Sequence, residues 1–311
     1  MKDFLKYTAA TVTGLLAFTV IIAAIGMMSI VGMIASSESS GPVEDNSVLV
    51  IPLTGSLQER AEDNILSRIA GQTGAEVGLD EILDGIRKAK DNEKIKGIYI
   101  EAGAFQADSY ASLQAIRKSL LDFRKSGKWI VAYGDSYTQA TYYIASVADK
   151  VMLNPQGVID WHGIASQQFY LKDLMAKFGV RMQLAKVGAY KSAPEMFTAD
   201  KMSEPNREQV TAYITGVWQN ILKEVSESRN ISKEQLNLYA DKLIMFDDPQ
   251  NYLKYKMVDK LAYTDEVKDV VKQMMKAGED DDLNKVAISD MASVKDKRDK
   301  GDEIAVYYAY G

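Results

Sequence analysis

The sequence predicts an α/β domain with a mainly parallel sheet and flanking helices, preceded by one transmembrane helix. Two observations carry this prediction. From about residue 46 onward, short apolar runs alternate with segments of helical periodicity, a pattern typical of a parallel sheet covered by helices. In addition, the stretch from Tyr7 to Ser37 carries no charge, and its apolar part exceeds the roughly 20 residues that cross a bilayer.

The N-terminal apolar run, residues 9–35, is expected to be a signal anchor. A cleavable signal core needs only about 7–15 apolar residues, although cleavage near Ala35 stays open as an alternative. Lys2 and Lys6 precede the run and acidic residues follow it. The positive-inside rule then places residues 1–8 in the cytoplasm and everything after the anchor on the other side. We therefore expect a single-pass protein of the cytoplasmic (inner) membrane, with residues 36–45 as a linker to an extracytoplasmic domain.

Composition excludes several classes of site. The chain has a net charge of −6, and residues 1–37 contribute +1, so the acidic remainder is a poor partner for nucleic acid. There is no cysteine and a single histidine, His162. A disulfide framework, a cysteine nucleophile and a zinc site of Cys/His type are thereby excluded. We expect neither a metal nor a cofactor.

The elements follow in order along the chain. Strands are expected at residues 48–53, 95–100, 128–133, 151–153 and 182–187. Helices are expected at residues 79–86, 110–123, 137–147, 170–178, 205–227, 252–258 and 264–275, with one more after Ser232. Ser203 and Ser232 stand where helix N-caps are expected, and Pro205 suits a first turn because its missing N–H costs nothing there.

The last ten residues, 302–311, repeat the pattern of residues 46–55. In both, an acidic or amide residue precedes an apolar run that ends in glycine. The pattern predicts that a first domain, residues 46–289, is followed by a charged linker, residues 290–301, and by the first strand of a second, truncated copy of the fold. Chance similarity of so short a pattern is the alternative.

Lys191 is the candidate catalytic residue. It follows the apolar run 182–187 and lies among Tyr190, Ala193 and Pro194. Burial at the end of a strand would lower the pKa of its amine from about 10.4 and allow it to act as a general base. The plain alternative is a surface lysine after a strand, which is the usual environment of this residue type.

Three motifs give the chain its family resemblance. They are VGAYKSAPE (residues 187–195), DKMSEPNRE (residues 200–208) and YYIASVADKVMLNPQG (residues 142–157). With the anchor and other matching stretches they cover nearly the whole chain, which resembles the signal peptide peptidase A family, membrane-anchored Ser–Lys peptidases of the ClpP/crotonase superfamily. The resemblance implies a ClpP/crotonase-like fold of repeated β-β-α/βα units. It also implies two homologous halves, of which the first supplies the base lysine, here Lys191, and the second the nucleophilic serine.

Two departures from the catalytic pattern indicate that this half carries no nucleophile. Gln139 stands where the resemblance places the serine, in the segment TQATYY. The segment Gly103–Phe105 replaces the paired glycines whose backbone N–H groups form an oxyanion hole. We expect Ala104 and Phe105 to crowd a substrate there.

The implied function is that of a membrane-anchored serine endopeptidase that degrades signal peptides or similar hydrophobic peptides, with its serine in a missing C-terminal half. The chain alone would be inactive, and the family implies a homo-oligomer. One alternative is a non-catalytic, membrane-anchored module that binds peptides or assembles partners, which Gln139 favours. Acyl-CoA chemistry is a weaker alternative, because the paired glycines are missing and the anchor would be unexplained.

The remaining polar candidates are expected to have structural roles. Ser192 adjoins Lys191, but neighbours on an extended chain point to opposite faces. The others are His162 in a loop, Ser136 as an N-cap, Tyr142 and Tyr143 in packing, and Asp281 and Asp282 in a solvated acidic run.

Overall fold

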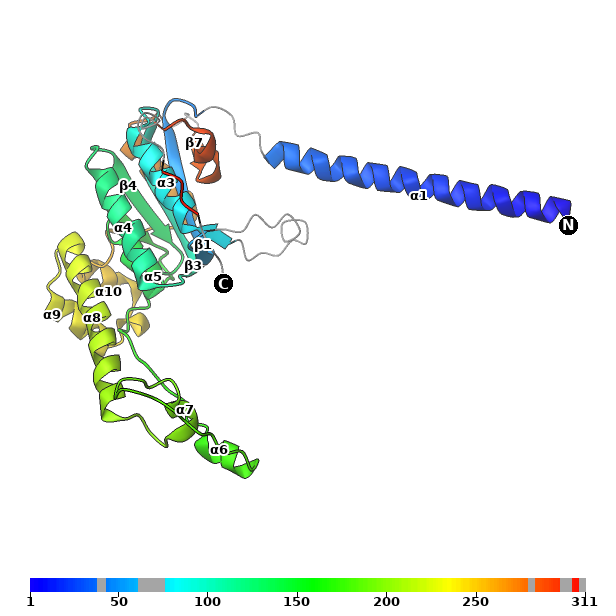
Figure 1. The fold of residues 1–311 in the computed structure, drawn as a ribbon. Coiled ribbons are helices and arrows are strands. Elements are labelled where there is room, and N and C mark those ends of the chain that lie inside the picture. The colour runs from blue at the N-terminus through cyan, green and yellow to red at the C-terminus, as the bar shows by residue number, and fades with distance from the viewer. Residues whose placement is uncertain (38–42, 61–75, 279–282, 297–303, 308–311) are drawn as a thin grey trace. The chain divides into compact units, whose positions relative to one another are not determined.

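The computed structural model describes residues 1–37, 43–60, 76–278, 283–296 and 304–307. The chain divides into two units, Met1–Val43 and Glu44–Gly311 (Figure 1). The first contains helix α1, Lys2–Ser37. Within it, Lys2–Gly26 is long and apolar enough to cross a membrane. A signal sequence has the same properties, so the helix agrees with the expected anchor without distinguishing it from a signal.

The second unit is built on one sheet whose paired strands are all parallel, as predicted. Its strands are β1 (Ser47–Gln58), β2 (Glu76–Gly78), β3 (Ile95–Gln106), β4 (Trp129–Gly134), β5 (Lys150–Leu153), β6 (Lys260–Leu261) and β7 (Asn284–Ala287). The order is β2-β1-β3-β4-β5-β6, and β7 also pairs with β1. On one edge of β1, β7 pairs with its first residues and β2 with its last.

Helices cover both faces of the sheet because its strands are apolar on both sides. Helices α3 (Leu79–Asp91) and α4 (Tyr110–Arg124) pack together on one face (Figure 1). Helix α11 (Thr264–Met275) lies on the other. Its three buried valines at positions 267, 270 and 271 share one helical face and pack against Val131 and Tyr133 of β4.

Capping signals located the second-half helices well. Ser203 caps α8 (Glu204–Arg229) and Ser232 caps α9 (Lys233–Asp241), as predicted, and the range of α11 matches the expected one. Helix α10 runs Pro249–Lys254 rather than over residues 252–258. It starts earlier because the Asp248 side chain accepts a hydrogen bond from the N–H of Gln250. It ends earlier because the backbone turns left-handed at Lys256, where φ is 59°.

Three strand predictions were incomplete or wrong. Strand β1 continues to Gln58, beyond the expected residues 48–53. Strand β3 continues to Gln106, because the segment expected to turn away stays paired with β1, Phe105 opposite Gly55. Residues 182–187, expected to be a strand, are irregular. Strand β6 occupies the edge next to β5 and ends the sheet there, so this run has no partner strand among the residues that the structure describes.

The C-terminal part of the second unit differs from the predicted domain limits. The unpredicted strand β7 is followed by a 3-10 helix, η2 (Ser289–Ser293), whose Met291 is buried. Packing therefore continues past residue 289, into the segment expected to be a linker. Of residues 302–311 only 304–307 are described, and they are exposed and outside any strand. The second copy of the fold stays a prediction, and Asp281 and Asp282 lie outside the described residues.

Candidate active site

Lys191 lies in an extension of the second unit that precedes α8. We call residues 164–202 the arm. It contains two short helices, α6 (Lys172–Lys177) and α7 (Glu195–Thr198), which contact each other, and irregular segments elsewhere. Figure 1 shows α6 and α7 beyond the first turn of α8, away from the sheet. The sheet therefore does not position Lys191; the contacts of the arm with α8 do.

A tight turn presents Lys191. The N–H of Lys191 donates to the carbonyl of Gly188 at 3.4 Å, and the N–H of Glu195 donates to the carbonyl of Ser192 at 2.9 Å. Gly188 has a φ of 101°, a conformation that L side chains rarely adopt. The glycine of VGAYKSAPE is thus required by the backbone geometry of the turn that carries the lysine.

The Lys191 side chain is exposed, which corrects the expectation of burial at a strand end. It lines an open cavity of about 540 Å³ together with a second lysine, Lys186. The other lining residues are mostly apolar, among them Leu184, Val187 and Pro194. Among the described residues, no carboxylate lies within ion-pair distance of the Lys191 amine, whereas Lys186 pairs with Glu195 at 3.9 Å.

Glu195 joins two of the motifs on which the resemblance rests. Its buried carboxylate accepts hydrogen bonds from the Ser203 hydroxyl at 2.5 Å, the Ser203 N–H at 3.3 Å and the Asn206 amide at 3.0 Å. The hydrogen bond from Ser203 is the largest contribution that lowers the pKa of this carboxyl below its ordinary value, against a smaller opposing effect of burial. The end of VGAYKSAPE is therefore fixed to the first turn of α8.

Gln139 occupies the position predicted for an absent serine. It is the first residue of α5 (Gln139–Ala145) and is only 4% exposed. Its side-chain oxygen accepts from the backbone N–H groups of His162 and Gly163 at 3.2 and 3.0 Å. Its amide nitrogen donates to the Gly163 carbonyl at 3.1 Å and the Tyr110 hydroxyl at 3.3 Å. The amide is thus fully engaged as a cross-link between α5 and the 162–163 loop.

The segment predicted to replace an oxyanion turn is part of the sheet. Gly103 is packed so closely that a Cβ there would lie 2.6 Å from the Thr54 side chain. Phe105 is buried in the core rather than crowding a substrate, and Ala104 is exposed. The register between β1 and β3 shifts at this point, so Gly103 and Ala104 lie at an irregularity of the strand. Only one glycine stands there, instead of the paired glycines of an oxyanion turn.

Other candidates have structural contacts. Thr138, not Ser136, caps α5 by accepting from the N–H of Thr141, because that helix begins two residues later than expected. The buried Tyr142 and Tyr143 donate hydrogen bonds to the Met257 carbonyl and to Glu224, and burial raises the pKa of both hydroxyls. His162 lies 3.6 Å from Asp160 in a half-exposed loop.

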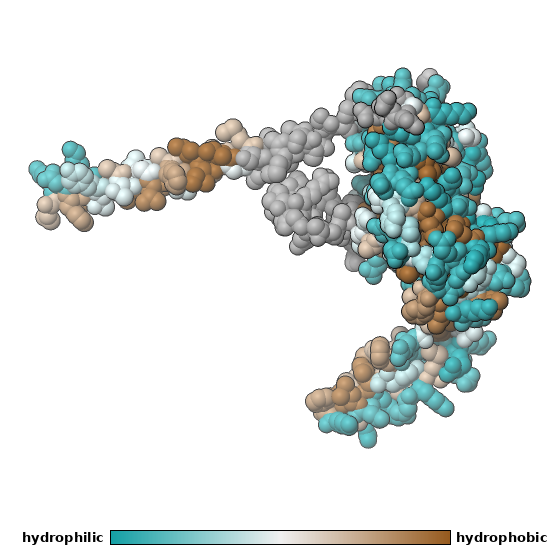
Figure 2. Space-filling view, turned by 180° about the vertical axis from the view of Figure 1, so that it is seen from behind, coloured by the Kyte–Doolittle hydropathy of each residue, from teal (hydrophilic) through white to brown (hydrophobic). Residues whose placement is uncertain are grey.

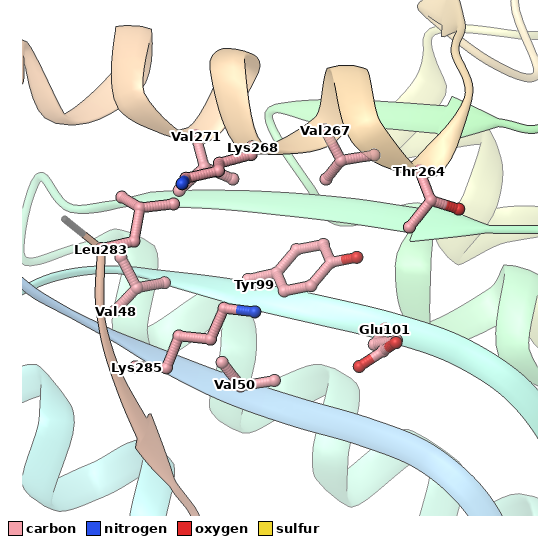
Figure 3. A pocket seen from close by; sticks show the side chains of 10 residues that line it. All are labelled: Val48, Val50, Tyr99, Glu101, Thr264, Val267, Lys268, Val271, Leu283 and Lys285. Carbon is pink, nitrogen blue, oxygen red and sulfur yellow. The ribbon is translucent and has the colours of Figure 1, made fainter. Parts of the chain in front are cut away.

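A second cavity, of about 310 Å³, lies between the sheet and α11 (Figure 3). Valines of β1 and α11 line it, and the hydroxyl of Tyr99 points toward the end where Glu101 and Thr264 lie. Burial raises the pKa of Tyr99, so it remains a hydrogen-bond donor at neutral pH. Sequence reasoning missed this cavity because its lining comes from four elements. It contains no nucleophile paired with a base.

No group of three or more His, Cys, Asp or Glu side chains suited to a metal ion occurs among the described residues.

Comparison with known proteins gives one matching family and several relatives. The profile of peptidase family S49 matches residues 122–278. Protease 4 of Salmonella typhi is 38% identical over 243 residues, which cover 76% of this chain and 39% of that protein. The chloroplastic serine protease SPPA of Arabidopsis thaliana is 22% identical over 253 residues, covering 81% and 36%. The chain spans less than half the length of these relatives.

Two solved structures are similar at low identity. A mutant of the membrane-bound stomatin-specific protease 1510-N is 13% identical, with a TM-score of 0.42 over 78% of this chain and 97% of that one. The catalytic domain of the ClpP protease of Plasmodium falciparum is 12% identical, with a TM-score of 0.35 over 70% and 85%.

Proposed function

Because this chain belongs to peptidase family S49, we propose that it is the base-bearing part of a membrane-anchored serine endopeptidase. Lys191 is the general base, and the nucleophilic serine comes from sequence outside this chain. Two observations together carry the proposal. Lys191 is exposed and has no carboxylate partner among the described residues, and the buried Gln139 stands at the expected serine position. The short coverage of the relatives agrees with a second half elsewhere.

The chemistry is a two-step hydrolysis. The neutral amine of Lys191 takes the proton of the serine hydroxyl while the serine oxygen attacks the scissile carbonyl. The C–N bond then breaks, Lys191 returns the proton to the leaving amine, and water hydrolyses the acyl-enzyme. A general base must be within about 3 Å of the hydroxyl and neutral at the working pH. For a lysine that titrates near 10.4 in water, neutrality at pH 7 requires about 4 kcal/mol of differential stabilisation.

The arm carries an apolar surface that suits such desolvation when it is covered. Phe169, Phe178 and Val187 are 69%, 75% and 92% exposed, and Figure 2 shows hydrophobic atoms gathered on the arm. Isolated exposed apolar residues are ordinary, but a contiguous group marks an interaction surface. We assign it to assembly with the serine-bearing half and with further copies of the enzyme, so the active form is a homo-oligomer in which Lys191 is buried.

The anchor and the apolar cavity lining favour hydrophobic peptides as substrates. An enzyme held at the membrane by α1 meets peptides released from it, and signal peptides carry an apolar core of about 7–15 residues. We place the second unit on the extracytoplasmic side of the cytoplasmic membrane, on the charge asymmetry around the anchor.

The test is a matched pair of lysine variants in the longer protein that contains this chain. Lys191→Ala should lower hydrolysis of a fluorogenic hydrophobic peptide by about 10³-fold or more, whereas Lys186→Ala, in the same cavity, should retain most of it. Retained activity in Lys191→Ala would overturn the assignment. A fluorophosphonate probe, which labels activated serines, should not label the chain alone.

The alternative is a non-catalytic peptide-binding or assembly module, and the cross-linking role of Gln139 is the observation that favours it. This alternative is favoured if neither lysine variant affects hydrolysis but the chain alone binds an apolar peptide with micromolar affinity, measured by fluorescence anisotropy.

A further inference from the structure

We propose that Glu195 is the positioning residue for Lys191; this inference rests on the proposed function. Glu195 is one of few buried charged residues of the second unit, and none of the roles described so far requires a carboxylate there. A charge is buried at high cost unless hydrogen bonds and an opposite charge compensate it. The hydrogen bonds and the ion pair of the Glu195 carboxylate should therefore indicate its role.

The carboxylate is one point at which the arm is fixed to α8; the hydrogen bond from the Tyr190 hydroxyl to Glu208, at 2.9 Å, is another. Ser203 both caps α8, accepting from the N–H of Asn206, and donates its hydroxyl proton to Glu195. Asn206 is itself buried and divides its two amide protons between Glu195 and Gln168 at 3.0 Å each. Segments around residues 168 and 195 are thereby held to the first turn of a 26-residue helix. The turn that presents Lys191 ends at Glu195, so the same bonds fix its position.

The carboxylate also distinguishes the two lysines of the cavity, because it pairs with only one of them. Lys186 lies 3.9 Å from Glu195, whereas Lys191 has no carboxylate within ion-pair distance among the described residues. An ion pair stabilises the charged form of a lysine, and a general base must lose its charge. Among the described residues, Glu195 thus pairs with Lys186 and not with Lys191, which faces the cavity without a carboxylate neighbour.

Glu195→Gln tests the inference, because it keeps the shape and removes the charge. The NH2 group of the glutamine would then face Ser203 or Asn206, which are themselves donors, so a hydrogen bond is lost. The ion pair with Lys186 is lost as well. Glu204→Gln is the matched control, since it removes an exposed carboxylate from the same helix start. Both are made in the longer protein beside Lys191→Ala. For Glu195→Gln we expect kcat to fall by about 10- to 100-fold, as for a misplaced catalytic group, with KM within about twofold.

Hydrogen–deuterium exchange provides the structural readout. Glu195→Gln should speed exchange in residues 186–200 and leave β3 and β4 unchanged, and Glu195→Asp, which keeps the charge, should restore part of kcat. If Lys191→Ala abolishes hydrolysis but Glu195→Gln leaves kcat unchanged, the positioning role is wrong and the proposed function stands. A rise in KM alone would assign Glu195 to substrate binding and overturn the inference. If Lys191→Ala keeps its activity, the proposed function itself fails, whatever Glu195 does.

Discussion

Replacing Gln139 by alanine tests whether the residue at the expected serine position acts as a structural cross-link. The side chain makes four hydrogen bonds and is 4% exposed, and two of its partners are backbone N–H groups of the 162–163 loop. In the alanine variant the N–H groups of His162 and Gly163 and the Gly163 carbonyl lose their partner. Leaving a buried polar group unsatisfied costs about 1–3 kcal/mol, and water reaching the half-exposed loop recovers part of it.

We therefore expect Gln139→Ala to lower the free energy of unfolding by about 2–4 kcal/mol. For a domain of this size that corresponds to a fall in Tm of roughly 4–16 °C. The assay is thermal unfolding of the chain in detergent micelles, followed by tryptophan fluorescence. Trp161 adjoins the loop and lies 5.2 Å, ring centre to ring centre, from Trp218, so the signal reports on this region.

Gln114→Ala is the matched control. Gln114 is exposed and donates one hydrogen bond, to Glu224 at 2.7 Å, and surface substitutions of this kind change stability by at most about 0.5 kcal/mol. If the two variants unfold at the same temperature, the cross-link contributes nothing and the reasoning about Gln139 is refuted. Gln139→Ser should be destabilised like the alanine variant. It should gain no reactivity toward a fluorophosphonate, since the candidate base Lys191 lies in the arm, away from the sheet.

Three further predictions concern backbone space and charge. Gly188→Ala should raise the rate of limited proteolysis in the arm severalfold, because a side chain is strained at its φ of 101°, whereas Gly216→Ala in α8, with nothing within 4 Å of the added Cβ, should not. Gly97→Ala should lower Tm strongly, since its Cβ would lie 2.3 Å from the Trp129 indole; an unchanged Tm would contradict the packing. The lowered pKa of Glu195 means that its stabilisation of the arm is complete above the carboxyl's ordinary pKa, about 4.5, and is lost as pH falls through the lower folded value. Protection of residues 186–200 against hydrogen exchange, corrected for the intrinsic pH dependence of amide exchange, should fall as the carboxyl is protonated; protection that stays constant through that titration would refute it.

Local signals predicted much of this fold. Ser203 and Ser232 cap their helices because a hydroxyl followed by free N–H groups is a short-range interaction, readable from a few residues. The central strands could also be predicted from the sequence, because strands buried on both faces are continuously apolar. The resemblance drew attention to Gln139 as the residue at the expected serine position, which stays a prediction. Its partners in the 162–163 loop lie 23 and 24 residues away and have no sequence signature.

The errors fall where a segment depends on a distant partner. Residues 182–187 have strand-like composition, but a strand needs a neighbour, and this part of the sheet ends at the two-residue strand β6. The prediction of a buried Lys191 failed with it, because it assumed that strand. Strand β3 was predicted too short, since its last residues are retained by pairing with β1 rather than by their own composition.

The two outer edges of the sheet have a consequence for the aggregation of the protein. On one side β1 is covered by β7 at residues 47–50 and by β2 at residues 56–58, and the gap between them contains Pro52, which has no N–H to offer. On the other side the outermost strand, β6, is two residues long. Within the described residues, neither edge presents the long row of free amides and carbonyls on which chains add to one another as aggregates. The assembly that we propose for the apolar arm would therefore take place without a sheet edge that recruits other chains.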